Sequence, residues 1–391
     1  MTTAFTHTNI VDVIHETLIP DTTVLVEDNL IKAIEANFPI SENTKVVNLN
    51  GKTMLPGLFN CHVHMCAGAG TGAPEVLSQA AQTIRALGNL KTLINSGVTY
   101  IRDAGAPDYI DVELHNAQLA GTILAPEMQT ACRCICMTGG HGHSDGREAD
   151  GPDDCRKAAR EQLKAGANWI KVMATGGVMT KGVEPGSPQL TEDELRAAIE
   201  EAHKAGAKSF THAQGMEGIK NALRAGVDSI EHGFFMDQWC FDWMNEHNVF
   251  LVPTLAAPYW IKTYGTKAGI PDYMVSKVEK TMNSHWETFR HAHKAGVKIA
   301  LGTDAGTPFN TFDKTGFEAV LMVQNGMTPM EAIQCGTIHA AELLNVKDTH
   351  GSITVGKKAN LAVFEKNPLE DINAIMDCTM TILGGKIVFE K

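Results

Sequence analysis

Residues 205–215 read AGAKSFTHAQG, and the same order of residue types returns four more times along the chain. The other copies are SGVTYIRDAG from Ser96, AGANWIKVMATGG from Ala165, AGVDSIEHG from Ala225 and AGVKIALGTDAG from Ala295. In each copy a glycine ends a stretch with helical spacing, and a short β-branched or apolar run follows the glycine. Because such a run is typical of a buried parallel strand, the phrase predicts a repeated unit of helix and strand.

Three less regular copies of the strand segment raise the expected number of strands to eight. They are PGLFNCHVH (56–64), PEMQTACRCICM (126–137) and NVFLVPTL (248–255). All the units end in polar residues of one kind, so an α/β fold with a (β/α)8 TIM barrel explains the series better than a doubly wound sheet. We assign this barrel to residues 56–350. Thr191 and Glu194 also have capping-box spacing, which predicts a helix start there.

The two ends of the chain have a different pattern. Residues 1–55 and 351–391 contain alternating strands and few helical stretches. We therefore expect these two segments to pair into one small domain, a β-sandwich built from both ends of the chain.

The composition excludes some classes of partner. The chain has 391 residues, with 45 acidic and 33 basic side chains and a formal net charge of −12, which argues against nucleic acid or an anionic membrane as a partner. We find neither a basic leader nor an apolar stretch of about 18 residues, so we expect a cytoplasmic protein. A homo-oligomer is compatible with the sequence.

The odd number of cysteines, nine, predicts reduced thiols, with Cys132, Cys134 and Cys136 on one face of a single strand.

Polar residues at the tips of the expected strands form a candidate site. His62 and His64 stand two apart on the first strand, so both side chains leave one face and can hold one ion. The other tips carry Lys171, His212, His232 and Asp304. Imidazole together with carboxylate suits Zn²⁺.

Lys171 is the unusual member of the candidate site. An ammonium group cannot bind a metal ion, but a lysine that has reacted with CO₂ becomes an anionic carbamate that can bridge two ions. The alternative is a lysine in a salt bridge with a nearby acid. Lys171 also lies five residues after the glycine that ends the helical stretch in its copy of the repeat, whereas His212 and His232 lie six residues after theirs. The loop before the fourth strand must therefore differ in length.

These segments resemble the amidohydrolase superfamily over nearly the whole chain. The resemblance lies in PGLFNCHVHM, WIKVMATGG, THAQG, SIEHG, GTDAG and the closing MTPMEAIQCGTIHAAELLNV and GSITVGKKANLAVFEKNPLEDI. Asn360 and His339 depart from the usual family residues outside the metal set. The resemblance implies that His62, His64 and Asp304 hold one divalent ion, that His212 and His232 hold a second, and that carbamylated Lys171 bridges the two.

Within the superfamily the chain is most similar to the imidazolonepropionase-related, prolidase-like group that includes Xaa-Pro dipeptidases, with ochratoxinase-type amidases as relatives. CICMTGGHGH (134–143) and KVMATGGVMT (171–180) carry this likeness. It implies a small-molecule substrate, a dipeptide or N-acyl amino acid, whose amide bond is cleaved by metal-activated hydroxide. Asp304 would then move the proton from water to the leaving amine, and His141 or His143 would polarise the carbonyl group. The group usually has a tyrosine after the sixth-strand histidine, where this chain has Phe234 and Phe235.

Other interpretations stay open from the sequence. The site could belong to a deaminase or a cyclic-amide hydrolase, although Gly215 stands where deaminases of this fold have a glutamate. The chain could also be an inactive binding protein, and His141 and His143 could be solvent-exposed loop residues. Arg147 and Lys181 are candidates to bind a substrate carboxylate, on their charge alone.

Overall fold

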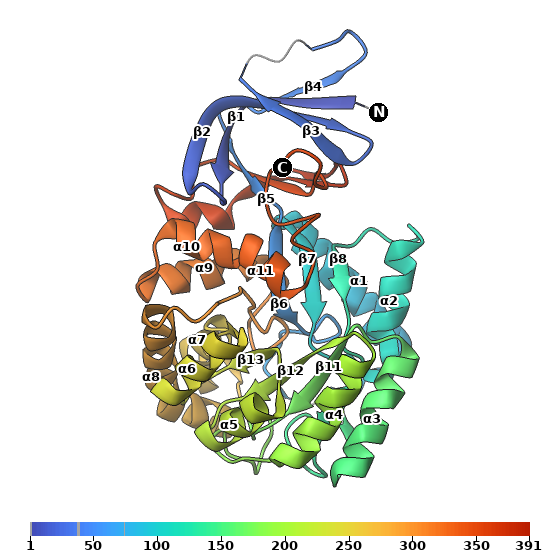
Figure 1. Cartoon of the computed structure of the whole chain (residues 1–391), viewed down its shortest axis with the longest axis vertical. Coiled ribbons are helices and arrows are strands. Elements are labelled where there is room, and N and C mark those ends of the chain that lie inside the picture. The colour runs from blue at the N-terminus through green and yellow to red at the C-terminus, as the bar shows by residue number, and fades with distance from the viewer. Residues whose placement is uncertain (1, 37–39, 74) are drawn as a thin grey trace.

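The structure, a computed structural model, describes residues 2–36, 40–73 and 75–391. Helices surround a group of parallel strands, and a separate β region formed by both ends of the chain lies against one end of this unit (Figure 1). Residues 1 and 37–39, which the predicted end domain includes, lie outside the described residues. Among the described residues, no helix combines the length and the hydrophobicity that a membrane span requires.

In the part of the chain that the structure describes, the two ends share one sheet of eight strands. They are β1 (Thr2–Asp12), β2 (Thr17–Glu27), β3 (Leu30–Glu35), β4 (Lys45–Asn48), β5 (Thr53–Pro56), β15 (Leu361–Phe364), β16 (Cys378–Leu383) and β17 (Lys386–Glu390). The antiparallel pair of β5 and β15 joins the N-terminal strands to the C-terminal ones. A bridge from Leu30 to Lys358 brings edge strand β3 to the segment before β15. The sheet therefore bends back on itself, and its description as a sandwich stays a prediction.

The parallel strands form two ladders. One contains β6 (Leu58–Val63), β7 (Val98–Asp103) and β8 (Glu127–Gln129). The other contains β10 (Arg147–Glu148), β9 (Ile135–Cys136), β11 (Trp169–Met173), β12 (Lys208–Ala213), β13 (Ser229–His232) and β14 (Phe250–Val252) in that order. Single contacts link the ladders: Trp169 N–H donates to Thr130 O, and parallel bridges join Leu251 to Ile299 and Val63 to Ala305. Within the described residues, the eighth predicted strand is thus present only as bridges.

Helices follow the strands along the chain, as the repeated phrase predicted. They are α1 (Gln79–Asn95), α2 (Ile110–Leu119), α3 (Pro152–Ala165), α4 (Glu192–Lys204), α5 (Met216–Ala225), α6 (Gln238–His247), α7 (Ala256–Tyr264), α8 (Asp272–Lys294), α9 (Thr315–Gln324), α10 (Pro329–Cys335) and α11 (Ile338–Leu343). The capping box predicted at Thr191 and Glu194 is present at the start of α4. It satisfies backbone N–H groups that have no partner within the helix.

The third predicted strand is wrong as a single element. Residues 126–137 form two short strands, β8 and β9, and Cys132 between them has a left-handed backbone with φ of 58°. The Asp111 carboxylate on α2 accepts a hydrogen bond from Cys132 N at 2.7 Å and holds this break. Cys132, Cys134 and Cys136 therefore do not alternate along one strand. All nine cysteines are buried, and each is free in the structure.

Candidate metal centre

All the predicted site residues except Arg147 line one cavity of about 660 Å³ at the carboxyl ends of the parallel strands. β6 carries His62, and His64 follows its end; β11, β12 and β13 carry Lys171, His212 and His232. Asp304 lies in the segment whose residues Ile299 and Ala305 form bridges to β14 and β6, and its N–H donates to His62 O at 2.8 Å. The convergence follows from the topology, because parallel strands of such a unit end on the same side.

The strand register explains how Lys171 reaches the site. Lys171 pairs with Phe210 in the ladder, two residues before His212. Counted from the phrase glycines Gly166 and Gly206, the fourth strand enters the ladder one residue later than the fifth. This is the difference in loop length that the sequence predicted. Opposite residues of a parallel pair share a face, so Lys171 and His212 point to the same side of the sheet.

His232 and Asp304 reach the site through an unusual backbone. His232 pairs with Ala213, one position out of step with the face that His212 occupies. Its φ of 72°, and that of 60° at Asp304, lie in the left-handed region, which costs free energy for residues other than glycine. Strict alternation along a strand would not have placed either side chain.

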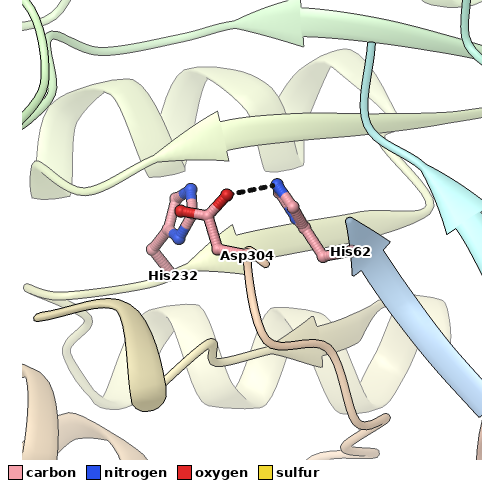
Figure 2. A group of neighbouring side chains, drawn as sticks. All are labelled: His62, His232 and Asp304. Carbon is pink, nitrogen blue, oxygen red and sulfur yellow. Dashed lines mark ion pairs between the residues drawn. The ribbon is translucent and has the colours of Figure 1, made fainter. Parts of the chain in front are cut away.

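Three candidate ligands converge closely. The potential ligand atoms of His62, His232 and Asp304 lie within 4.8 Å of one another, and Figure 2 shows them approaching from β6, β13 and the loop that carries Asp304. Asp304 Oδ1 lies 3.4 Å from His62 Nε2 and 3.2 Å from His64 Nε2. The ring centroids of His232 and His212 are 4.5 Å apart. Asp304 and the four imidazoles thus form one continuous cluster.

The hydrogen bonds of these histidines fit metal binding. His62 Nδ1 contacts the Glu231 carboxylate at 2.6 Å, and His212 Nε2 contacts Gly176 O at 3.1 Å. An ionised carboxylate and a carbonyl oxygen can only accept hydrogen bonds. The two ring nitrogens that contact them therefore carry the protons, and the other nitrogen of each ring keeps its lone pair. Burial also holds the pKa values of His62, His212 and His232 well below the usual value. Neutral, anchored imidazoles are the form that binds a divalent ion.

Lys171 lies in the cluster without an acidic partner. Its side chain is 1% exposed, and its Nζ lies 4.7 Å from the Phe210 ring centroid. Among the described residues, no acidic side chain lies within ion-pair distance of Lys171, which argues against the alternative of a salt bridge. Burial lowers the pKa of Lys171 to about 8, although the charges of Glu231 and Asp304 oppose the shift. A larger fraction of this amine is therefore neutral, the form that reacts with CO₂.

The two loop histidines differ in position. The His141 ring centroid lies 4.2 Å from that of His212, and its side chain is buried, whereas His143 is exposed at the cavity wall. His141 Nδ1 contacts Thr180 Oγ1 at 2.9 Å. A Cβ at Gly177 would come within 2.5 Å of His141 Nε2, so glycine is needed for the ring to fit. The structure thus places His141 nearer the candidate ligands.

A model of the amidohydrolase family matches residues 53–388. The chain belongs to the amidohydrolase family. Ochratoxinase of Aspergillus niger is 29% identical over 372 residues, which cover 85% of this chain and 75% of the relative. Imidazolonepropionase of Fusobacterium nucleatum is 22% identical over 414 residues, which cover 94% of this chain and 91% of the relative. A crystal structure of a Xaa-Pro dipeptidase with methionine bound in its active site is 32% identical, with a TM-score of 0.92 over the full length of both chains.

These findings confirm the family resemblance that the sequence predicted, and with it the TIM-barrel type of fold with an additional domain. The family supports a hydrolase that acts on amide bonds, and family members generally use divalent metal ions. The individual roles of the site residues in this amidohydrolase stay predictions.

Lys181 and Arg147, the two residues predicted to bind a substrate carboxylate, lie in different surroundings in the structure. Lys181 is exposed and lines the cavity. Arg147 does not line it, and its guanidinium forms ion pairs with Asp154 at 2.8 Å and Glu161 at 2.9 Å. These two acids raise the pKa of Arg147 further. We therefore retain only Lys181 as a candidate for substrate binding in this amidohydrolase.

Sequence reasoning missed Glu231 and Arg102. Both are fully buried, and the Arg102 Nη2 atom lies 2.9 Å from Glu231 Oε1. The signal was a charged residue inside an otherwise buried strand, in SIEHG and in YIRD. Such residues are rarely buried without a partner.

Proposed function

We propose that this amidohydrolase cleaves the amide bond of a dipeptide or an N-acyl amino acid at a site for two divalent ions, with Zn²⁺ as the expected metal. The observation that carries the proposal is the cluster of imidazoles around Asp304, of which burial keeps His62, His212 and His232 neutral, together with a buried lysine that has no acidic partner among the described residues. The likeness to a Xaa-Pro dipeptidase and to ochratoxinase supports the choice of an amide substrate.

His62, His64 and Asp304 would hold one ion, and His212 and His232 the second. The neutral amine of Lys171 would attack CO₂, forming an N–C bond and losing a proton, and the resulting carbamate would bridge the two ions. When bound, the ions supply Lewis acidity and bring the pKa of a coordinated water towards neutrality.

The protein side chains would manage the protons of the reaction. The Asp304 carboxylate accepts the proton of the attacking water and passes it to the amide nitrogen, which leaves as an amine. His141, whose pKa burial lowers to about 3, is neutral and can donate through Nε2–H to the substrate carbonyl oxygen if Thr180 donates to Nδ1. Lys181 would meet the free carboxylate of the substrate.

Metal content provides the first test of this proposal. We expect about two ions per chain in the active protein, loss of activity on treatment with a chelator, and recovery on addition of Zn²⁺. Elemental analysis of the purified protein measures this directly. One ion per chain would favour a deaminase, and none would favour a binding protein. A screen of dipeptides and N-acyl amino acids with Zn²⁺-loaded protein then tests the substrate class.

The loop histidines provide a second test. His141→Ala should lower kcat by about 10²- to 10³-fold with unchanged metal content, because it removes a donor to the developing oxyanion. His143→Ala is the matched control, since it lies on the same loop but is exposed, and it should keep most of its kcat. Steady-state kinetics at fixed metal content measure both variants. If both retain wild-type kcat and kcat/KM, the oxyanion is stabilised without this loop.

A further inference from the structure

The four candidate histidine ligands differ in what lies behind them. In three of them the second ring nitrogen contacts a neutral group. His64 Nδ1 lies 3.4 Å from Gly105 O, His212 Nε2 lies 3.1 Å from Gly176 O, and His232 Nδ1 lies 2.7 Å from Thr254 Oγ1. His62 is the exception, because its Nδ1 lies 2.6 Å from a carboxylate oxygen of Glu231.

Glu231 is held in place by its second oxygen. Oε1 accepts from Arg102 Nη2 at 2.9 Å and from Ser229 Oγ at 2.7 Å, which leaves Oε2 for His62. The three side chains Arg102, Glu231 and His62 are each at most 1% exposed. This carboxylate is therefore fixed in position and removed from water.

Arg102 is itself fixed by several contacts. Its Nε donates to Cys61 O at 2.7 Å and its Nη1 donates to Ser229 Oγ at 3.1 Å. The guanidinium carbon lies 4.1 Å from the Phe210 ring centroid and 4.6 Å from that of Trp169. A permanent cation in this position favours the ionised form of Glu231 in a region that otherwise disfavours charge.

We propose that Glu231, supported by Arg102, is a positioning residue that makes the ion held through His62 the more tightly bound of the two. This inference rests on the two-ion site of the proposed function. A carboxylate that accepts a hydrogen bond from Nδ1–H fixes the tautomer and the orientation of the ring. It also makes Nε2 a more basic metal ligand than a neutral hydrogen-bond acceptor would. In the three other histidines the second ring nitrogen faces a neutral group, so we expect the two ions to bind with different affinities.

A metal titration of apo protein tests the inference. Protein freed of metal by a chelator is titrated with Zn²⁺ in bicarbonate buffer against a chromophoric competitor, which yields one dissociation constant for each ion. We expect two distinct constants in the wild type. Glu231→Gln should weaken the tighter ion by about 10- to 100-fold and leave the weaker ion unchanged. Thr254→Val, which removes the neutral partner of His232, is the matched control and should leave the tighter ion unchanged.

The outcomes separate this inference from the proposed function. Two ions with equal constants in the wild type, or an equal weakening of both ions in Glu231→Gln, would overturn the inference alone. Binding of fewer than two ions by the wild type would overturn the proposed function as well. If Glu231→Gln does not fold, Glu231→Asp decides, because it keeps a charge opposite Arg102 but shortens the reach to His62. Unchanged metal binding in folded Glu231→Asp would contradict the inference.

Discussion

Replacement of Lys171 by alanine is expected to remove most of the metal and to lower kcat/KM by roughly a thousandfold or more, since metal catalysis contributes several kcal/mol. The variant lacks the carbamate of Lys171, which in the proposed site is the anion that bridges the two ions. Two divalent ions would then be held by neutral imidazoles and the single carboxylate of Asp304, and their mutual repulsion would be opposed by less negative charge. Elemental analysis and steady-state kinetics measure the two losses together.

Two comparisons make this prediction specific. Lys208→Ala is the matched control, because Lys208 begins the neighbouring strand β12 and donates to Leu343 O, so it should keep both ions. A short carboxylic acid added to Lys171→Ala should restore part of the activity by replacing the carbamate. An active wild-type enzyme whose Lys171 is unmodified and does not contact metal, seen by intact mass or crystallography, would contradict the prediction.

The arrangement of the candidate ligands could be predicted from the sequence because it depends on local repetition. Each phrase carries its own glycine, strand and polar tip, so His212 could be placed at the barrel mouth without knowledge of distant contacts. Lys171 followed from the same rule once one residue of difference in the preceding loop was allowed, and the ladder between β11 and β12 has that difference.

The parts that could not be predicted depend on contacts between distant segments. The break at Cys132 is held by Asp111 from another element, and no local pattern signals it. Arg147 is paired with Glu161 on α3 instead of facing the cavity. The left-handed backbones of His232 and Asp304 break the alternation of side chains between the two faces of a strand, on which the placement of His62 depends. The buried pair of Arg102 and Glu231 joins two strands that lie 129 positions apart in sequence.

Asp304→Asn is expected to keep its metal and to lose kcat by about 10²- to 10⁴-fold, the usual contribution of a positioned acid–base group. Burial would raise the pKa of Asp304, but the hydrogen bond with His64 and the positive charges of His64 and Lys171 lower it to about 2. The group is therefore a carboxylate at neutral pH and can accept a proton. An asparagine in its place keeps an oxygen that can contact an ion but cannot carry the proton to the leaving amine.

Kinetics and metal content at saturating Zn²⁺ measure this variant, and Asp313→Asn is the control, since Asp313 is an exposed acid near the same loop. The result gains its meaning from comparison with Lys171→Ala. Loss of turnover with retained metal in Asp304→Asn, beside loss of both in Lys171→Ala, would separate proton transfer from metal binding within one cluster. Near-normal turnover in Asp304→Asn would place the base elsewhere.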